Sequence, residues 1–259
     1  MHFPVSLLSK ADLLGAWAPA LFAAAAPSPR QQAELLYLWD RATPEGKIII
    51  IVLLIFSIFA WSVMVAKALQ MRRAKRLNGF FDTEFRSQPT VLTLYDRRIN
   101  VPECPLFVVY QEGCKELDNR LRSSSGVGRK TRVSLKSMEH VKRALENAVA
   151  RESLKLESGL ILLAIAVSGA PFLGLLGTVW GVMSSFSYVA MRGKADLATM
   201  APGVSAALMT TVAGLLVAIP SMFGYNWLVH TLRVLTVNLD NFAQELVSKC
   251  ETEFLQDEE

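Results

Sequence analysis

The sequence predicts an all-α integral membrane protein with three transmembrane helices and long helices that extend into the cytoplasm. Hydrophobic residues make up 52% of the 259 residues, and the mean hydropathy is +0.32. The apolar residues are gathered in three long runs, each above the roughly 20 residues that cross a bilayer. A basic cluster directly after the first run predicts which side of the membrane faces the cytoplasm.

Residues 1–46 are expected to form a periplasmic N-terminal segment. The apolar run over residues 13–26 is too short to span a bilayer and is typical of a signal-peptide core, with an interfacial segment as the alternative. Residues 31–41 fit a short interfacial helix. Thr43 can cap the helix that follows, and Pro44 suits its first turn.

The first transmembrane helix is expected over residues 47–69. Its one charge near the inner end, Lys67, can extend toward the membrane surface while its aliphatic chain stays in lipid. Four basic residues follow at once: Arg72, Arg73, Lys75 and Arg76. Basic residues mark cytoplasmic flanks, so the N-terminus is expected to be periplasmic and the C-terminus cytoplasmic.

Residues 70–157 are expected to form a basic, mostly helical cytoplasmic loop. Breaks are predicted near Pro89, at Pro102 and in the serine-rich stretch near residue 124. One apolar stripe predicts a helix from about residue 131, and its members are Leu135, Met138, Val141, Leu145 and Ala148. No glycine or proline stops this helix before Gly159, so it can run straight into the second transmembrane helix.

The second transmembrane helix is expected over residues 158–190, which is longer than a bilayer requires. This helix must therefore project from the membrane or pack against partner helices. A short periplasmic loop is expected over residues 191–200, because the weak basic pair there cannot outweigh the cluster after the first helix.

The third transmembrane helix is expected over residues 201–230. Pro202 suits its first turn, and Pro220 lies inside the helix and should kink it. Residues 231–259 are expected to form an acidic cytoplasmic tail with an amphipathic helix.

Composition and motifs argue against several functional classes. The net charge of +4 is too small to predict nucleic-acid binding. The sequence contains no nucleotide-binding loop, no hydrolase elbow and no histidine or cysteine cluster with metal-ligand spacing. We therefore expect no enzyme activity, no metal and no cofactor, and the lipid bilayer as the surrounding medium.

Small and hydroxyl-bearing residues stand out in the second and third apolar runs. Gly177 and Gly181 form a small-xxx-small pair, as do Ala170 and Gly174, and such pairs let helices approach closely in lipid. Helix packing alone is an adequate reading of this common pattern. Hydroxyl groups on both runs favour a polar seam: Thr178, Ser184, Ser185, Ser205, Thr210 and Thr211.

No charged residue lies in the middle of any apolar run. Hydroxyl groups cannot bind and release a proton at useful affinity near neutral pH. If the protein moves protons, the titrating carboxylate must come from another chain.

Two motifs lie on the second and third apolar runs. The first is APFLGLLGTVWGVMSSF at residues 170–186, and the second is APGVSAAL at residues 201–208. The second motif continues through Thr211, the AIP of residues 218–220 and the YN of residues 225–226. In their order and placement these motifs resemble the ExbB/TolQ branch of the MotA/TolQ/ExbB proton channel family.

The resemblance implies an oligomeric helical bundle, in which five copies surround two helices of an ExbD- or TolR-like partner. That partner would supply a membrane aspartate. Proton flow would turn the partner helices and act on a TonB- or TolA-like protein that crosses the envelope. The function implied is therefore a proton-channel (stator) subunit of the inner membrane.

The resemblance also implies roles for individual residues. Thr178 and Thr211 match the pore-facing threonines and would relay protons beside the partner's aspartate. Six residues would shape helix packing and kinks: Pro171, Gly174, Gly177, Gly181, Pro202 and Pro220. Many ExbB and TolQ proteins have a glutamate where this chain has Ala206. Its absence favours the alternative of a non-conducting scaffold, whereas Thr178 and Thr211 favour conduction.

Overall fold

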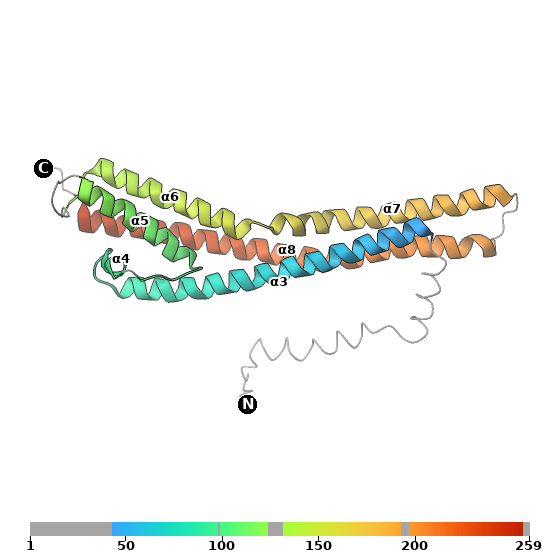
Figure 1. Ribbon diagram of the computed structural model, residues 1–259, viewed down its shortest axis with the longest axis horizontal. Helices are drawn as coiled ribbons and strands as arrows, with labels where there is room; N and C mark the ends of the chain where they lie inside the picture. Colours follow the sequence, from blue (N-terminus) through green and yellow to red (C-terminus); the bar gives the residue numbers. More distant parts are fainter. Residues whose placement is uncertain (1–42, 98, 124–131, 193–196, 256–259) are drawn as a thin grey trace, which may run out of the picture. The chain divides into compact units, whose positions relative to one another are not determined.

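The computed structural model describes residues 43–97, 99–123, 132–192 and 197–255, which form six α-helices and no extended strand (Figure 1). The expected all-α class is confirmed for these residues. The signal-peptide or interfacial segment expected before residue 43 lies outside them. Contacts divide the chain into a first unit, Met1–Ile51 with Gly174–Val212, and a second unit, Val52–Leu173 with Ala213–Glu259.

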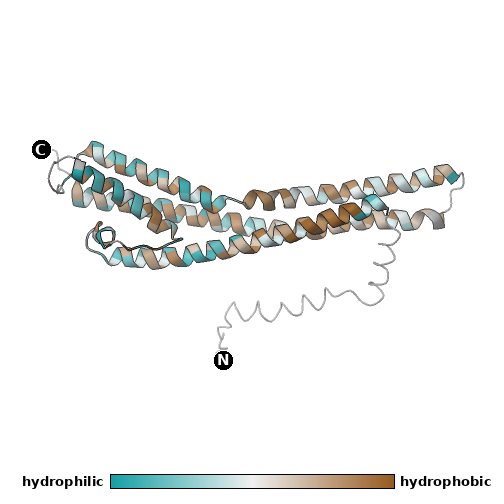
Figure 2. Ribbon diagram, viewed as in Figure 1, coloured by the Kyte–Doolittle hydropathy of each residue, from teal (hydrophilic) through white to brown (hydrophobic). Residues whose placement is uncertain are grey.

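Three helices are long and apolar enough to cross a membrane: α3 (Pro44–Ser87), α7 (Leu160–Arg192) and α8 (Leu197–Phe254). Figure 2 shows hydrophobic residues concentrated in the first half of α3 and in the first turns of α7, whereas the rest of both helices is mixed. Large apolar side chains on all three helices are exposed, including Ile58, Phe172 and Leu216. Such faces are stable only against lipid or other chains.

Local sequence signals account for both ends of α3. The Thr43 hydroxyl accepts a hydrogen bond from the Gly46 amide at 3.3 Å, which is the expected N-terminal cap. Pro44 occupies the first helical position, where its missing N–H costs nothing. The helix continues well past the apolar run and ends at Ser87, because the residue before Pro89 avoids helical geometry.

A break separates α6 (Leu135–Glu157) from α7, so the continuous helix that the sequence allowed does not form. Ser158 is the C-cap of α6, and Gly159 has a φ of +84°, in the left-handed region that glycine enters readily. Ser134 caps the start of α6, since its hydroxyl accepts from the Ser137 amide at 3.4 Å. Helices α6 and α7 are thus separate elements.

The expected loop over residues 191–200 is also shorter than predicted. Helix α7 continues to Arg192 and α8 begins at Leu197, with residues 193–196 outside the described part. Pro202 therefore lies in the second turn of α8 rather than the first. Leucine, alanine and methionine around residue 200 favour helix strongly, which explains the early start.

Helix α8 joins the expected third transmembrane helix and the expected tail into one element. It continues through Pro220, which cannot donate a hydrogen bond to the preceding turn. The Ser221 hydroxyl donates to the Val217 carbonyl at 2.7 Å beside this gap. The kink expected at Pro220 stays a prediction.

The hydrophobic core lies in the second unit. Aromatic rings from α3, α5 (Pro105–Ser123) and α8 meet there: Phe81, Phe85, Phe107, Tyr110 and Phe242. The apolar stripe predicted on α6 is buried except for Leu135, which is 56% exposed. A short helix, α4 (Thr93–Asp96), adds the buried Leu94.

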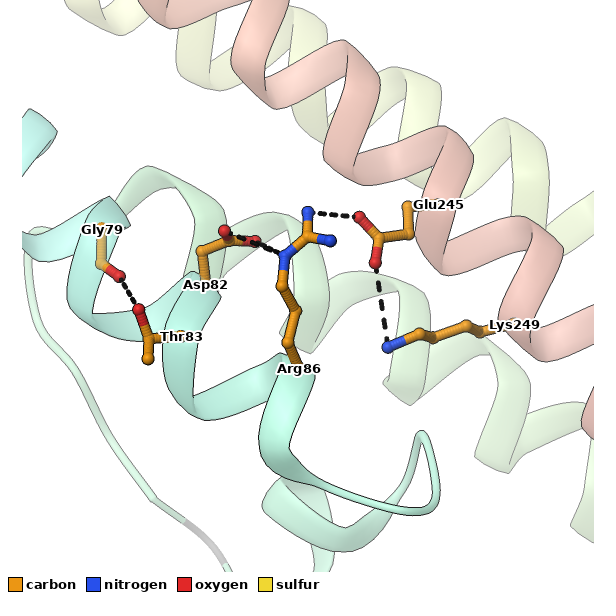
Figure 3. Close-up of polar contacts among 6 residues, drawn as sticks. All are labelled: Gly79, Asp82, Thr83, Arg86, Glu245 and Lys249. Atoms are coloured by element: carbon orange, nitrogen blue, oxygen red, sulfur yellow. Dashed lines mark hydrogen bonds and ion pairs between the residues drawn. The ribbon is translucent and has the colours of Figure 1, made fainter.

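Polar contacts join α3 to α8 at the edge of this core. Figure 3 shows the Arg86 guanidinium between the Asp82 carboxylate, 3.1 Å away, and the Glu245 carboxylate, 2.6 Å away. Lys249 lies 3.8 Å from the other Glu245 oxygen. Since Arg86 is well exposed, we expect these ion pairs to orient the helices more than to stabilise them.

The C-terminal turns of α8 belong to the folded unit and are not a free tail. The Glu253 carboxylate accepts from the Val91 amide at 2.8 Å, and the Phe254 carbonyl accepts from the Val133 amide at 2.8 Å. Both contacts tie loop segments of the second unit to α8. Leu235, Leu239 and Leu246 are also buried, as the amphipathic pattern of this segment predicts.

Replacing Tyr110 with phenylalanine should destabilise the second unit by about 1–3 kcal/mol. The buried phenol donates to the Val91 carbonyl at 2.6 Å and accepts from the Tyr95 amide at 2.9 Å. Phenylalanine keeps the ring but leaves both backbone groups without their partner. Thermal unfolding of the purified protein, compared with the exposed change Tyr188→Phe, measures the loss.

Candidate functional site

Two predicted hydroxyl groups meet between α7 and α8 in the first unit. The Thr178 and Thr211 hydroxyl oxygens are 2.6 Å apart, within hydrogen-bonding distance. Thr178 also donates to its own helix, at 3.1 Å from the Gly174 carbonyl and 3.0 Å from the Leu175 carbonyl. The structure thus brings together the two residues that the family resemblance implies for a proton pathway.

The Gly174 carbonyl is the common acceptor of this network. The hydroxyls of Thr178, Thr210 and Thr211 lie 3.1, 3.1 and 3.2 Å from its oxygen. A carbonyl oxygen has two lone pairs, so it cannot serve three hydroxyls in addition to its helix bond. The hydroxyl protons must therefore share this acceptor with alternatives, such as the Ala207 carbonyl, 2.7 Å from the Thr210 hydroxyl.

Small residues let α7 and α8 come this close. A Cβ atom added at Gly181 would lie 2.6 Å from the Cβ of Ala207 and 3.3 Å from its Cα. One added at Gly177 would lie 2.7 Å from the Cβ of Thr210. These glycines, predicted from the sequence to shape packing, have no room for a side chain.

The sequence placed Thr210 in the polar seam but did not predict its role in helix packing. Thr210 is fully buried, it fills the space that Gly177 leaves, and its methyl group faces Gly46 of α3, where an added Cβ would lie 3.9 Å away. Adjacent helical residues point about 100° apart, so Thr210 faces the packing contact while Thr211 faces Thr178. A helical-wheel comparison of the second and third apolar runs, with Gly177 placed at the contact between them, could have pointed to Thr210 as its packing partner.

Ala206 is buried, with 3% of its surface exposed. A glutamate at this position would be enclosed by the protein as described, so the alanine fits its surroundings. Pro202 is half-buried in the same unit. Pro171 and Pro220 belong to the second unit.

The hydroxyl network contains no group that titrates near neutral pH. In the first unit, the single carboxylate among the residues that the structure describes is Glu45, in the first turn of α3. No cluster of three or more potential metal ligands occurs in the described part of the chain. The arrangement can order water and pass a proton along hydroxyls, but it needs a proton-binding group from elsewhere.

Comparisons with known proteins identify the family of this chain. The model of the MotA/TolQ/ExbB proton channel family matches residues 113–241. A Tol-Pal system protein TolQ from Pseudomonas aeruginosa is 35% identical over 221 residues, covering 85% of this chain and 93% of that protein. A biopolymer transport protein ExbB from Xanthomonas campestris is 31% identical over 203 residues, covering 77% and 79% of the two chains. An ExbB from Neisseria meningitidis is 28% identical over 200 residues, covering 76% and 88%. The chain therefore belongs to the MotA/TolQ/ExbB proton channel family.

Proposed function

We propose that this chain is the proton-channel subunit of an inner-membrane motor of the ExbB–ExbD or TolQ–TolR type. The motor converts the proton motive force into mechanical work on a TonB- or TolA-like protein that crosses the envelope. The observation that carries the proposal is the Thr178–Thr211 hydroxyl pair, whose oxygens are 2.6 Å apart and share the Gly174 carbonyl. Thr178 and Thr211 act as relay groups, and Gly174, Gly177 and Gly181 hold the helices at the required spacing.

The partner in this proposal supplies the missing proton-binding group. Five copies of the chain surround a dimer of a single-span ExbD- or TolR-like protein, and the membrane aspartate of that protein takes up and releases the proton near the hydroxyl pair. Support comes from the lack of a titratable group in the hydroxyl network and from the exposed apolar faces of α3, α7 and α8. These faces require lipid or protein neighbours.

The proposed topology places the N-terminus in the periplasm and the C-terminus in the cytoplasm. The basic residues that follow residue 69 and the polar surface of α5 and α6 support a cytoplasmic second half of α3 (Figure 2). The relatives carry both TolQ and ExbB names. Co-isolation with a TonB-like or a TolA-like protein would assign the type.

Ala206 supports a second candidate, a non-conducting scaffold of the same kind of complex. In that case the chain assembles the partner and the trans-envelope protein but does not pass protons. The two candidates differ in one measurable property, which is proton flux across the membrane.

Proton flux in liposomes that contain the chain and its co-encoded partner separates these candidates. We expect flux in the wild type that requires the partner and falls about 100-fold in Thr211→Val, because valine keeps the shape and removes the relay hydroxyl. Thr211→Ser is the matched control and should keep most of the flux. A partner without its periplasmic domain must be included, since a resting partner can plug the channel.

The opposite outcome assigns the scaffold. No wild-type flux with either partner form, but flux in Ala206→Glu, would show that this chain has lost conduction at the position of the family glutamate. Since Ala206 is buried, Ala206→Gln controls for the size of the new side chain. Equal flux in wild type and Thr211→Val would contradict the relay role.

A further inference from the structure

The connection between α6 and α7 is a two-residue joint, Ser158 and Gly159, in the second unit. The Ser158 amide donates to the Leu154 carbonyl at 2.9 Å, and its hydroxyl donates to the Lys155 carbonyl at 2.8 Å. Gly159 then reverses the sign of φ, and α7 begins at Leu160. The joint links the cytoplasmic helix to the helix that carries Thr178.

The side chain of Lys67 reaches this joint from α3. Its ammonium nitrogen lies 3.4 Å from the Leu156 carbonyl oxygen, 3.4 Å from the Ser158 hydroxyl and 2.9 Å from the Gln70 amide oxygen. The Lys67 Cε atom is 3.3 Å from where a Cβ at Gly159 would be. One side chain therefore contacts the last turn of α6 and Ser158, and it lies beside Gly159.

Electrostatics favours this placement strongly. The last carbonyl groups of a helix lack intrahelical partners and carry the negative end of the helix dipole, so they attract a cation. Lys67 is the single charged residue of α3 between Lys47 and Arg72, and an ammonium in such an apolar stretch must find acceptors. A lysine that only extended to the membrane surface would be hydrated by water, whereas the half-buried Lys67 has three protein oxygens within 3.4 Å of its nitrogen.

We propose that Lys67 is a positioning residue that locks the α6–α7 joint and so sets the direction in which α7 leaves the cytoplasmic helices. This inference rests on the proposed function, because its consequence is that motor activity requires a rigid joint. Lys67 connects α3 to the joint by hydrogen bonds, while Gly159 supplies the backbone geometry that no other residue adopts easily. The lock keeps the direction of α7 constant while the partner helices turn.

Hydrogen exchange and proton flux, measured on the full chain with its partner in lipid nanodiscs and liposomes, test the lock. In Lys67→Met the amides of Ser158 and Leu162 should exchange roughly tenfold faster, as expected for one lost hydrogen bond to a charged group. Flux should fall in the same variant. Lys67→Arg keeps a donor cation and should show wild-type exchange at the joint and wild-type flux. Ser158→Ala should have a smaller effect than Lys67→Met on both measurements. Lys75→Met removes an equal charge from an exposed position of α3 and is the matched control.

Three results would overturn the proposal. The first is wild-type exchange at the joint in Lys67→Met. The second is faster exchange throughout the second unit, which would make Lys67 a general stabiliser. The third is reduced flux in Lys67→Arg although exchange at the joint is at the wild-type rate. Absence of flux in the wild type would instead count against the proposed channel function. The exchange measurement alone would then decide whether Lys67 locks the joint.

Discussion

Thr178→Val should reduce partner-dependent proton flux about 100-fold while the complex still assembles. Valine matches threonine in shape but has no hydroxyl, so the contact with the Thr211 hydroxyl oxygen at 2.6 Å is lost. The carbonyls of Gly174 and Leu175 keep their helical amide partners, so stability should change by about 1 kcal/mol or less. Flux in liposomes, with assembly checked by native mass spectrometry, measures both properties.

Thr178→Ser is the matched control for this prediction, because serine retains the hydroxyl and loses the methyl group. We expect it to conduct at a rate near that of the wild type. If Thr178→Val conducts normally, Thr178 has no relay role. If Thr178→Val fails to assemble, its hydroxyl is structural, and the assignment of the pathway would depend on Thr211 alone.

Gly181→Val should prevent stable packing of α7 against α8. The new Cβ would lie 2.6 Å from the Ala207 Cβ and 3.3 Å from its Cα, so the helix backbones themselves must separate. Overpacking of this kind costs about 1–3 kcal/mol or more, and the separation would also break the Thr178–Thr211 contact. We expect a lower unfolding temperature of the detergent-purified complex together with loss of flux.

Gly169→Val on the same helix is the control, because an added Cβ there would meet nothing within 4 Å in the chain itself. Both changes replace glycine with valine in a helix, so they share any effect of helix propensity. Equal unfolding temperatures for the two variants would show that the close approach at Gly181 contributes nothing to stability.

Much of the fold follows from local patterns. The Thr43 cap, the end of α3 before Pro89 and the apolar stripe of α6 each depend on residues within a few positions of one another. Local steric and hydrogen-bonding rules therefore predict them. The sequence allowed α6 to continue into α7, and the chain instead breaks at Gly159, whose positive φ the sequence permits but does not require.

The sequence placed Thr210 in the polar seam with Thr178 and Thr211, but it did not predict the packing role of Thr210. Thr210 looks like one more membrane hydroxyl, and such groups usually bond to their own helix. Its burial against Gly177 and its bond to the Gly174 carbonyl depend on how two helices meet. Ala206 is a similar case, since the sequence records a missing glutamate and the structure shows an enclosed methyl group.

By itself, the sequence determined the all-α class, the three apolar helices and the family motifs, because hydrophobic runs and short motifs are read along the chain. Only the tertiary structure decided which groups meet. The Thr178 and Thr211 hydroxyls are 33 positions apart, and Lys67 is 91 positions from Ser158. Such contacts form where separate helices approach closely. This approach depends on small residues on both helices together, so no local pattern along the chain predicts it.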